Sequence, residues 1–190
     1  MDKLKIGFAM CGSFCTFSLV IPELEKLALE NEVFPIMSEI SSSTDTRFGK
    51  AEDFKDRIRK ATNKEIISTI PAAEPIGPKK LLDILVVAPC TGNTLSKLAN
   101  AITDSTVTMA VKAHLRNNRP VVIAVSTNDA LSGSAKSIGT LMNCKNIYFV
   151  PLKQDDPLKK PTSLVADFSL IRQTIEKALK NEQIQPLYLT

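Results

Sequence analysis

Two unbroken apolar runs stand out in the hydrophobic pattern of the chain. Residues 84–88 (ILVVA) and 121–125 (VVIAV) contain neither a polar residue nor any alternation. Such runs are typical of strands buried on both faces, as in a parallel sheet. We expect them to form central strands, and the less continuous apolar runs at 3–9 and 32–37 predict two more. Pro35 makes the last of these an edge or irregular strand, because proline has no N–H to donate.

Segments with helical spacing alternate with these strands. The pattern predicts helices after residue 16 and at 50–62, 93–102, 106–117, 130–143 and 164–181, and short strands at 65–70 and 146–151. We expect Pro89 to end its strand, residues 71–80 to form an extended proline-rich connection, and the charges of residues 154–163 to face solvent. The alternation predicts an α/β fold: a doubly wound parallel sheet in a three-layer α/β/α sandwich.

Length and composition narrow the class of protein. The chain has 190 residues, which suits one α/β domain spanning 1–190. The net charge of +4 is spread along the chain, and aromatic residues make up 5% with no Trp. This argues against nucleic-acid binding, which uses clustered basic faces and stacking aromatics. No apolar stretch has the length of a membrane span and no secretory signal precedes the first strand, so we expect a cytoplasmic protein.

The cysteines and the one histidine do not indicate a metal site. The spacing of Cys11, Cys15, Cys90 and Cys144 fits no zinc pattern. We therefore expect reduced thiols and no bound metal. His114 lies between Lys112 and Arg116, so we expect it at the surface.

Polar residues follow the predicted strands that end at residues 9, 37, 88 and 125. In a doubly wound sheet these loops share the carboxyl edge, where such folds bind ligands. Their hydroxyls and amides, with the N–H groups of helix starts, predict a pocket that suits an anion. Taken singly, each loop is equally an ordinary helix cap, and we expect Ser13 to cap the helix that follows it. The candidate binding residues are Gly12, Ser13, Ser38, Pro89, Cys90, Thr91, Asn93, Thr94, Ser126, Thr127 and Asn128.

The predicted pocket lacks side chains for strong chemistry. It contains no Ser-His-Asp set and no paired carboxylates, so we expect a cofactor to supply the chemistry. Arg47 is a candidate clamp for a substrate carboxylate, which guanidinium binds bidentately. The alternative is a solvated loop, or an ion pair of Arg47 with Asp45 or Asp53. Arg47 and Asn128 are the candidate catalytic residues.

Several of these stretches resemble a known family. The loop with Gly12 and Ser13, Ser38 after the second strand, and residues 88–100 (APCTGNTLSKLAN) resemble the flavoprotein family, whose P-A-S/T-A-N-T segment corresponds to residues 89–94. That family includes phosphopantothenoylcysteine decarboxylase, lantibiotic cysteine decarboxylases and flavin prenyltransferases. The stretches TDTRFGKAEDF, AEPIGPKKLLD, RPVVIAVSTNDAL and KNIYFVPLKQDDPLKKPTS are more similar to one branch, a component of the enzyme that makes dipicolinate in spore-forming bacteria.

This resemblance implies a fold, a cofactor and partners. The fold would be a Rossmann-like, flavodoxin-type sandwich. FMN would bind with its phosphate near Gly12, Ser13 and Ser38, and with its ring near residues 89–94 and 126–128. The chain would form a homo-oligomer, a trimer or a multiple of it. With the A subunit of dipicolinate synthase, which is similar to nicotinamide-dependent dehydrogenases, it would use NADP to oxidise dihydrodipicolinate to dipicolinate in the mother cell of a sporulating bacterium.

Two positions depart from the decarboxylases of this family. Where they have a catalytic His before an Ile, this chain has Pro75-Ile76, and where they have Pro-Ala-Met-Asn it has residues 126–129 (STND). Two alternatives therefore stand beside the oxidoreductase hypothesis. One is a non-catalytic scaffold or substrate-channelling component, and the other is a flavin-dependent decarboxylase-like enzyme or prenyltransferase.

Overall fold

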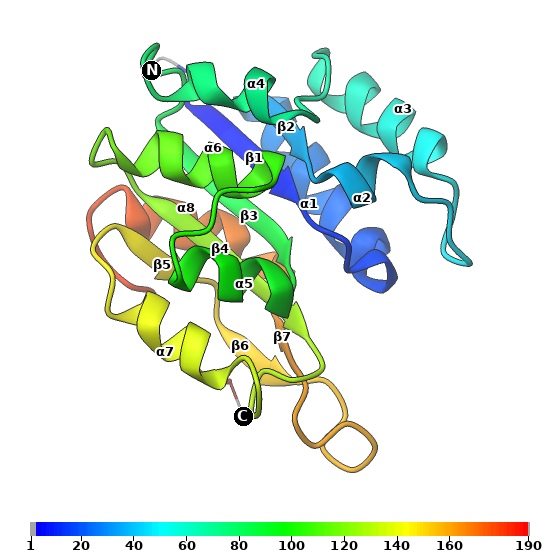
Figure 1. The fold of residues 1–190 in the computed structure, drawn as a ribbon, viewed down its shortest axis with the longest axis vertical. Helices are drawn as coiled ribbons and strands as arrows, with labels where there is room; N and C mark the ends of the chain where they lie inside the picture. Colours follow the sequence, from blue (N-terminus) through cyan, green and yellow to red (C-terminus); the bar gives the residue numbers. More distant parts are fainter. Residues whose placement is uncertain (1–2, 190) are drawn as a thin grey trace.

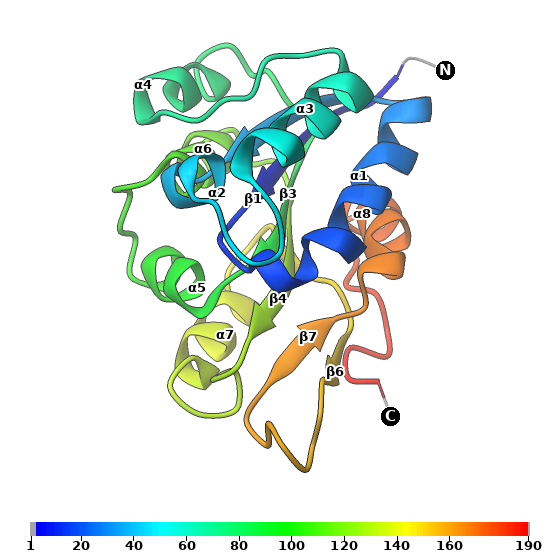
Figure 2. The same cartoon turned by 90° about the vertical axis from the view of Figure 1, so that its right-hand side faces the viewer.

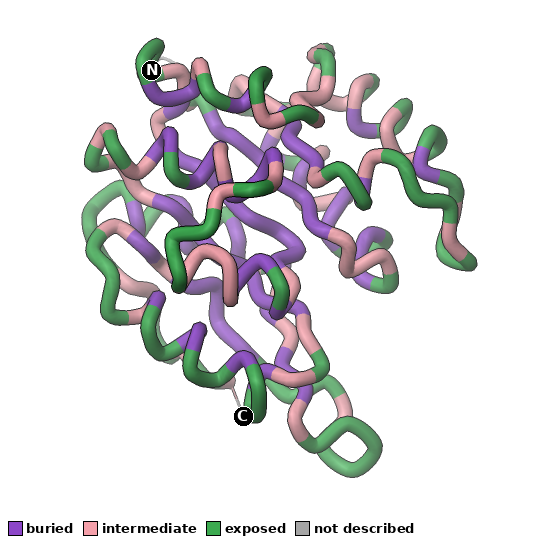
Figure 3. Tube along the Cα trace, in the orientation of Figure 1, coloured by how far each residue is buried: buried purple, intermediate pink, exposed green. Residues whose placement is uncertain are grey.

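A parallel sheet forms the centre of the computed structural model, which describes residues 3–189 (Figure 1). The parallel strands are, in spatial order, β2 (Glu32–Met37), β1 (Lys5–Met10), β3 (Ile84–Cys90), β4 (Val121–Thr127) and β5 (Ile147–Phe149). The two apolar runs become the neighbours β3 and β4, and β3 is buried along its whole length (Figure 3). Full burial of each large aliphatic side chain stabilises the fold by about 1.5–3 kcal/mol. The sheet therefore holds the core, as predicted.

Helices cover both faces of this sheet (Figure 2). The helices are α1 (Phe17–Glu30), α2 (Glu39–Ser43), α3 (Ala51–Thr62), α4 (Ile70–Ala73), α5 (Gly92–Ala99), α6 (Thr106–Leu115), α7 (Ala135–Met142) and α8 (Ile171–Ala178). Short 3-10 turns occupy Phe14–Thr16, Glu74–Ile76 and Phe168–Leu170. Helices α1 and α8 lie on one face, and α5, α6 and α7 lie on the other. This arrangement confirms the predicted α/β/α sandwich of the flavodoxin type.

An antiparallel hairpin extends the sheet beyond the prediction. Strands β6 (Leu152–Gln154) and β7 (Leu164–Ala166) pair with each other, and β7 pairs antiparallel with β4 at Ser126 and Thr127. The predicted helix over 164–181 is therefore wrong at its start, because the buried side chains of Leu164 and Ala166 alternate with the less buried Val165. The tip of the hairpin projects from the fold with its charges in solvent, as expected for residues 154–163 (Figure 1).

The segment before β3 also differs from the prediction. Residues 65–70 make only one isolated bridge, from Ile67 to Ile36 of the edge strand β2, rather than a strand. Helix α4 starts at Ile70, where the Thr69 hydroxyl accepts a hydrogen bond from the N–H of Ala72. The expectation of an extended connection over 71–80 was wrong, because Pro71 and Pro75 occupy the first turns of α4 and of the 3-10 turn that follows. The missing N–H of proline has no cost at such positions.

Strand β3 continues through Pro89 to Cys90, contrary to the prediction that it ends there. The pairing with β4 shifts register between Val87 and Cys90, so the regular ladder is interrupted around the proline. The Pro89 carbonyl accepts a 3.2 Å hydrogen bond from the N–H of Cys11. This bond ties the end of β3 to the loop after β1.

His114 is fully buried, so its predicted surface position was wrong. Helix α6 packs against α4 and the turn Glu74–Ile76, which the sequence pattern had not indicated as helical. The ring Nε2 lies 3.0 Å from the Pro120 carbonyl, and Nδ1 has no partner within residues 3–189. His114 is therefore part of the core.

Candidate functional site

The loops after four parallel strands meet at one edge of the sheet. The hydroxyls of Ser13, after β1, and Ser126, at the end of β4, lie 2.8 Å apart. The N–H of Ser38, after β2, donates to the Met10 carbonyl at 3.0 Å. Together with the bond from Cys11 to Pro89, these contacts join all four loops. The predicted convergence of polar side chains is present in the structure.

Two adjoining cavities open at this edge and share Gly12 and Thr91. The larger, of about 560 Å³, is also lined by Ser13, Ser126, Thr127 and Asn128. The smaller, of about 430 Å³, is also lined by Ser38, Asn93 and Thr94. Both volumes lie within the range of ligand pockets, roughly 300–1,000 Å³. Nine of the eleven candidate binding residues thus line one of the two cavities.

Pro89 and Cys90 lie beneath the cavities rather than in their walls. Both are buried in β3. Burial raises the pKa of the Cys90 thiol well above its usual value. The neighbouring Cys11 Sγ accepts a 3.3 Å hydrogen bond from the hydroxyl of Thr94. A thiol must ionise to act as a nucleophile, so Cys90 serves as a packed support of the site.

Helix starts shape the floor of the smaller cavity. The Thr91 hydroxyl caps α5, because it accepts from the N–H of Thr94 at 3.4 Å. The Ser38 hydroxyl caps α2 through the N–H of Ser41. Ser13 makes no such cap, contrary to expectation, because its hydroxyl is turned across the sheet to Ser126. The Asn93 side chain is exposed at the cavity.

The charged residues of both cavities are already engaged in contacts. In the smaller cavity the Glu39 carboxylate accepts from the N–H and hydroxyl of Thr106, at 2.9 and 2.7 Å. Lys97 pairs there with Asp104 at 2.8 Å, and its ammonium lowers the pKa of that carboxyl. Lys160 of the larger cavity lies 2.5 Å from Asp155. Hydroxyls, amides and backbone N–H groups are therefore the main means by which this site can hold a ligand.

Arg47 lies beside the larger cavity rather than in its wall. Its guanidinium is exposed and sits 4.9 Å from the centre of the Phe48 ring, and Phe48 lines that cavity. Asp45 accepts instead from the N–H of Ala51 at 2.8 Å. Within residues 3–189, Arg47 forms no ion pair with Asp45 or Asp53.

Two groups of residues near the site were missed by sequence reasoning. The hairpin brings Lys160 and Ser163 to the larger cavity. Their position could not be predicted from polar residues that follow strands, because β6 and β7 are only three residues long and show no strand pattern. Asp129 accepts hydrogen bonds from the hydroxyls of Thr127, at 2.6 Å, and Ser134, at 2.9 Å. The run of short polar residues after β4 was the only signal for this contact.

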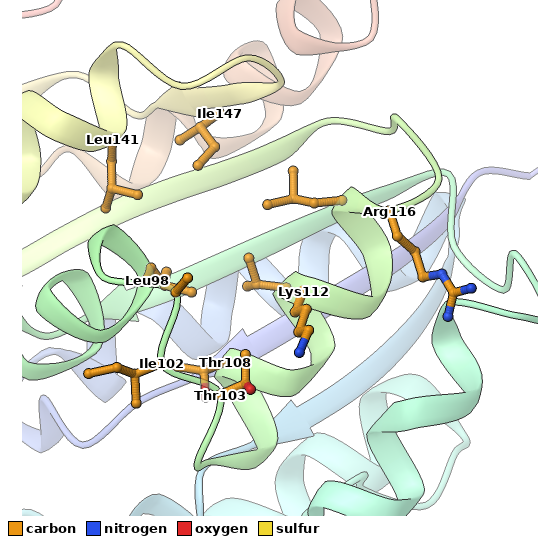
Figure 4. Close-up of a pocket in the computed structure, with 11 residues that line it drawn as sticks. Leu98, Ile102, Thr103, Thr108, Lys112, Arg116, Leu141 and Ile147 are labelled. Atoms are coloured by element: carbon orange, nitrogen blue, oxygen red, sulfur yellow. The ribbon is translucent and has the colours of Figure 1, made fainter.

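A third cavity is apolar and separate from the site. It has a volume of about 480 Å³ and lies between α5, α6 and α7 (Figure 4). Leu98, Ile102, Leu141 and Ile147 surround it, with Lys112 beside them. None of the candidate binding residues lines it.

Two kinds of feature are absent from residues 3–189. No cluster of His, Cys, Asp and Glu side chains in this range is arranged to hold a metal ion. None of the helices in the same range has the length and apolar character needed to cross a membrane.

The fold and the carboxyl-edge site are those of a flavoprotein-type α/β domain. The flavoprotein family model matches residues 1–163, so the chain belongs to the flavoprotein family. Over 191 aligned residues it is 52% identical to the B subunit of dipicolinate synthase from Bacillus subtilis (strain 168), covering 98% of this chain and 96% of that protein.

Solved structures agree with this assignment. The crystal structure of the B subunit of dipicolinate synthase from Bacillus halodurans C superposes with a TM-score of 0.91 at 44% identity, covering 100% of this chain and 97% of that one. The FMN binding protein AtHal3 superposes with a TM-score of 0.68 at 18% identity, covering 96% of this chain and 100% of that one. The second likeness shows the fold alone.

Proposed function

We propose that this chain acts as the B subunit of a dipicolinate synthase, oxidising dihydrodipicolinate to dipicolinate together with the A subunit during sporulation. The observation that carries the proposal is similarity to such proteins over nearly the whole chain, combined with an intact polar site at the carboxyl edge. The reaction removes two hydrogens, and NADP held by the dehydrogenase-like partner accepts a hydride while a proton is released. The product is an aromatic pyridine dicarboxylate.

The residues of the two cavities fit FMN. They offer hydroxyls and amides for a ribityl chain and a phosphate, and Gly12 joins the two cavities without a side chain. When bound, a flavin supplies the capacity to accept a hydride. Gly12, Ser13 and Ser38 would hold the phosphate. Thr91, Asn93, Thr94 and residues 126–128 would border the ring, with Pro89 and Cys90 buried beneath it.

The residues of this chain would orient the substrate. Arg47 or Lys50 would grip a carboxylate of the dicarboxylate substrate, since the loop that carries them borders the larger cavity through Phe48. Asn128, exposed at the same cavity, would donate a hydrogen bond to it. Phe14, Leu19 and Phe48 give the same wall an apolar surface.

A scaffold without catalysis is the second candidate. It is favoured by the missing acid–base set, since the one histidine is buried away from the cavities. In this case the chain would stabilise its dehydrogenase-like partner or channel the partner's substrate. A decarboxylase-like activity has less support, because Pro75 occupies the place of the catalytic His in that group and lies in a short 3-10 turn.

Reconstitution distinguishes these functions. The purified chain is mixed with the A subunit, dihydrodipicolinate and NADP, and the ultraviolet absorbance of dipicolinate is followed with and without FMN. Ser13→Ala and Asn93→Ala are expected to lower the rate more than tenfold, about 1.4 kcal/mol of barrier. Asn143→Ala, an exposed asparagine at the end of α7, is the matched control.

Each other outcome has a definite meaning. If the dehydrogenase-like partner reaches full rate by itself, a catalytic role for this chain is rejected. If the chain is required for activity, but Ser13→Ala and Asn93→Ala bind the partner and keep the full rate, the scaffold is favoured. Turnover of a cysteine-terminated peptide by this chain without its partner would favour the decarboxylase.

The proposal extends to assembly and location. We propose that residues 1–190 form one flavoprotein-type domain that assembles as a trimer or a multiple of it and works in the cytoplasm of the mother cell. Light scattering of the purified chain tests the assembly. A fluorescent fusion imaged during sporulation tests the location.

A further inference from the structure

Asp129 connects one wall of the candidate site to the start of α7 through one oxygen. It lies in the turn that follows β4, and its Oδ1 accepts hydrogen bonds from the Thr127 hydroxyl at 2.6 Å and the Ser134 hydroxyl at 2.9 Å. Thr127 lines the larger cavity, while Ser134 is buried and immediately precedes α7. One carboxylate oxygen therefore links a cavity residue to the start of a helix outside the cavity.

Gly92 allows α5 to pack against this cluster. A Cβ on Gly92 would lie 2.5 Å from Ser134 Oγ and 2.8 Å from both Asp129 Oδ1 and Thr127 Oγ1. Three polar atoms thus gather where any other residue type would place a carbon. Gly92 is the first residue of α5, directly after Thr91, which lines both cavities. The cluster therefore packs the end of β4 directly against the start of α5.

The charge of Asp129 suits this position. Its carboxylate lies against the N-terminal residue of α5, where the helix dipole favours negative charge. The hydrogen bond from Thr127, followed by that from Ser134, lowers the pKa of Asp129. The carboxylate is therefore ionised near neutral pH and accepts both bonds in its strong, charge-assisted form.

The hairpin holds the same loop from the other side. The Thr162 hydroxyl donates to the Asn128 carbonyl at 2.6 Å, and the N–H of Leu131 donates to the Thr162 carbonyl at 2.9 Å. Thr127 and Asn128 are thus held between the hairpin and the Asp129 cluster. A loop fixed on both sides loses little freedom when a ligand binds, which favours affinity.

We propose that Asp129 is a positioning residue, which fixes Thr127 and the start of α5 at the separation that the ligand of the larger cavity requires. The inference rests on the proposed function, in which that cavity binds FMN and the dicarboxylate. Asp129 itself does not line either cavity, so it acts through Thr127 and Gly92.

Four variants test this role. Asp129→Ala removes the acceptor, and Asp129→Asn keeps an Oδ1 that can accept both bonds without the charge. Ser134→Ala removes one donor outside the cavities. Ser132→Ala is the matched control, because within residues 3–189 the exposed Ser132 hydroxyl meets just the backbone carbonyl of Asp129, at 3.3 Å.

The first readout needs no ligand. Hydrogen–deuterium exchange of the full chain is compared for residues 91–95 and 126–134. Asp129→Ala is expected to speed exchange in both segments, and Ser134→Ala is expected to do so to a smaller degree. Asp129→Asn should lie between Asp129→Ala and the unmodified protein, and Ser132→Ala should match the unmodified protein. Unchanged exchange in residues 91–95 of Asp129→Ala would overturn the inference.

The second readout is binding. FMN affinity is measured by flavin fluorescence, and the KM for dihydrodipicolinate is measured in the reconstituted enzyme. Asp129→Ala should weaken one or both by about tenfold, in keeping with the loss of a charged hydrogen bond, and Asp129→Asn should restore most of this loss. Equal losses for the two variants would overturn positioning in favour of a direct effect of charge.

The two proposals fail differently. If the unmodified protein binds no FMN and adds nothing to the activity of its dehydrogenase-like partner, the proposed function fails, and the exchange experiment alone decides whether Asp129 fixes Thr127 and the start of α5. If Asp129→Ala does not fold, Ser134→Ala decides, since it removes one hydroxyl at the same acceptor. If Ser134→Ala then shows the same hydrogen–deuterium exchange and the same FMN affinity as Ser132→Ala, the inference is contradicted.

Discussion

The hydroxyl of Ser13 lies 2.8 Å from the hydroxyl of Ser126, although 113 positions separate them in the sequence. The contact passes over β3, which lies between β1 and β4 in the sheet. It brings the loops of the two flanking strands together above the central one. This hydrogen bond closes one side of the larger cavity, which both residues line.

Removing this hydrogen bond should show coupling between its partners. Ser13→Ala and Ser126→Ala are each expected to lower the free energy of unfolding by about 0.5–1.5 kcal/mol, as for a typical part-buried hydrogen bond. The double variant should lose less than the sum, because either change breaks the same bond. Urea unfolding of the four proteins measures this, with Ser18→Ala, an exposed serine of α1, as the control. Additive losses would show that the two hydroxyls do not interact in solution.

The cysteines offer a footprint of the site. Cys15 and Cys144 are exposed, whereas Cys11 and Cys90 are buried. Iodoacetamide should therefore label the first pair in the native protein and the second pair only after unfolding. Cys15 lines the larger cavity and Cys144 does not, so added FMN should slow the labelling of Cys15 alone, as measured by mass spectrometry. Protection of neither thiol, at FMN concentrations that saturate fluorescence, would place the flavin elsewhere.

Arg47 provides a test of substrate recognition. Arg47→Ala should change the free energy of unfolding by less than about 0.5 kcal/mol, because the side chain is exposed. The KM for dihydrodipicolinate should rise by roughly tenfold or more in the reconstituted enzyme, reflecting a lost charged hydrogen bond of about 1.5–3 kcal/mol. Arg47→Lys should give a smaller rise, since lysine keeps the charge without the bidentate fork. Lys136→Ala on α7 is the control. If Lys136→Ala and Arg47→Ala have the same KM, Arg47 does not bind the substrate.

His114 should make the fold sensitive to acid. Burial lowers the pKa of His114 from 6.5 to about 4, and the nearby Arg119 guanidinium acts in the same direction. Between these two values the unfolded chain binds a proton that the folded chain does not. The free energy of unfolding should therefore fall as the pH drops from about 6.5 to about 4, by up to about 3 kcal/mol in total.

A substitution isolates this contribution. His114→Phe should flatten the pH dependence of urea unfolding between pH 7 and pH 4.5. The Pro120 carbonyl keeps a partner in this variant, because the N–H of Leu85 also donates to it at 3.2 Å. An identical slope in both proteins would mean that His114 titrates alike in the folded and unfolded states.

Local sequence patterns determined the helices and strands of this fold more completely than they determined the contacts between them. The two apolar runs specify β3 and β4, since short apolar runs without alternation are typical of strands covered on both faces. The pattern failed where an element was too short to show a period. Strands β6 and β7 have three residues each, and α4 with the turn after it was hidden by prolines that happen to lie in first turns.

The sequence by itself determined the α/β/α sandwich and which loops share its carboxyl edge, because both follow from the order of buried strands and helices along the chain. Only the tertiary structure decided that Ser13 bonds to Ser126 rather than capping a helix, that His114 is buried, and that Asp129 gathers Thr127 and Ser134 against Gly92. Hydrophobic periodicity records how deeply a residue is buried. The hydrogen-bond partner of a polar side chain depends instead on which strands become neighbours and how closely their loops approach. Residues far apart in the chain determine this arrangement, and they come together only when the sheet has formed.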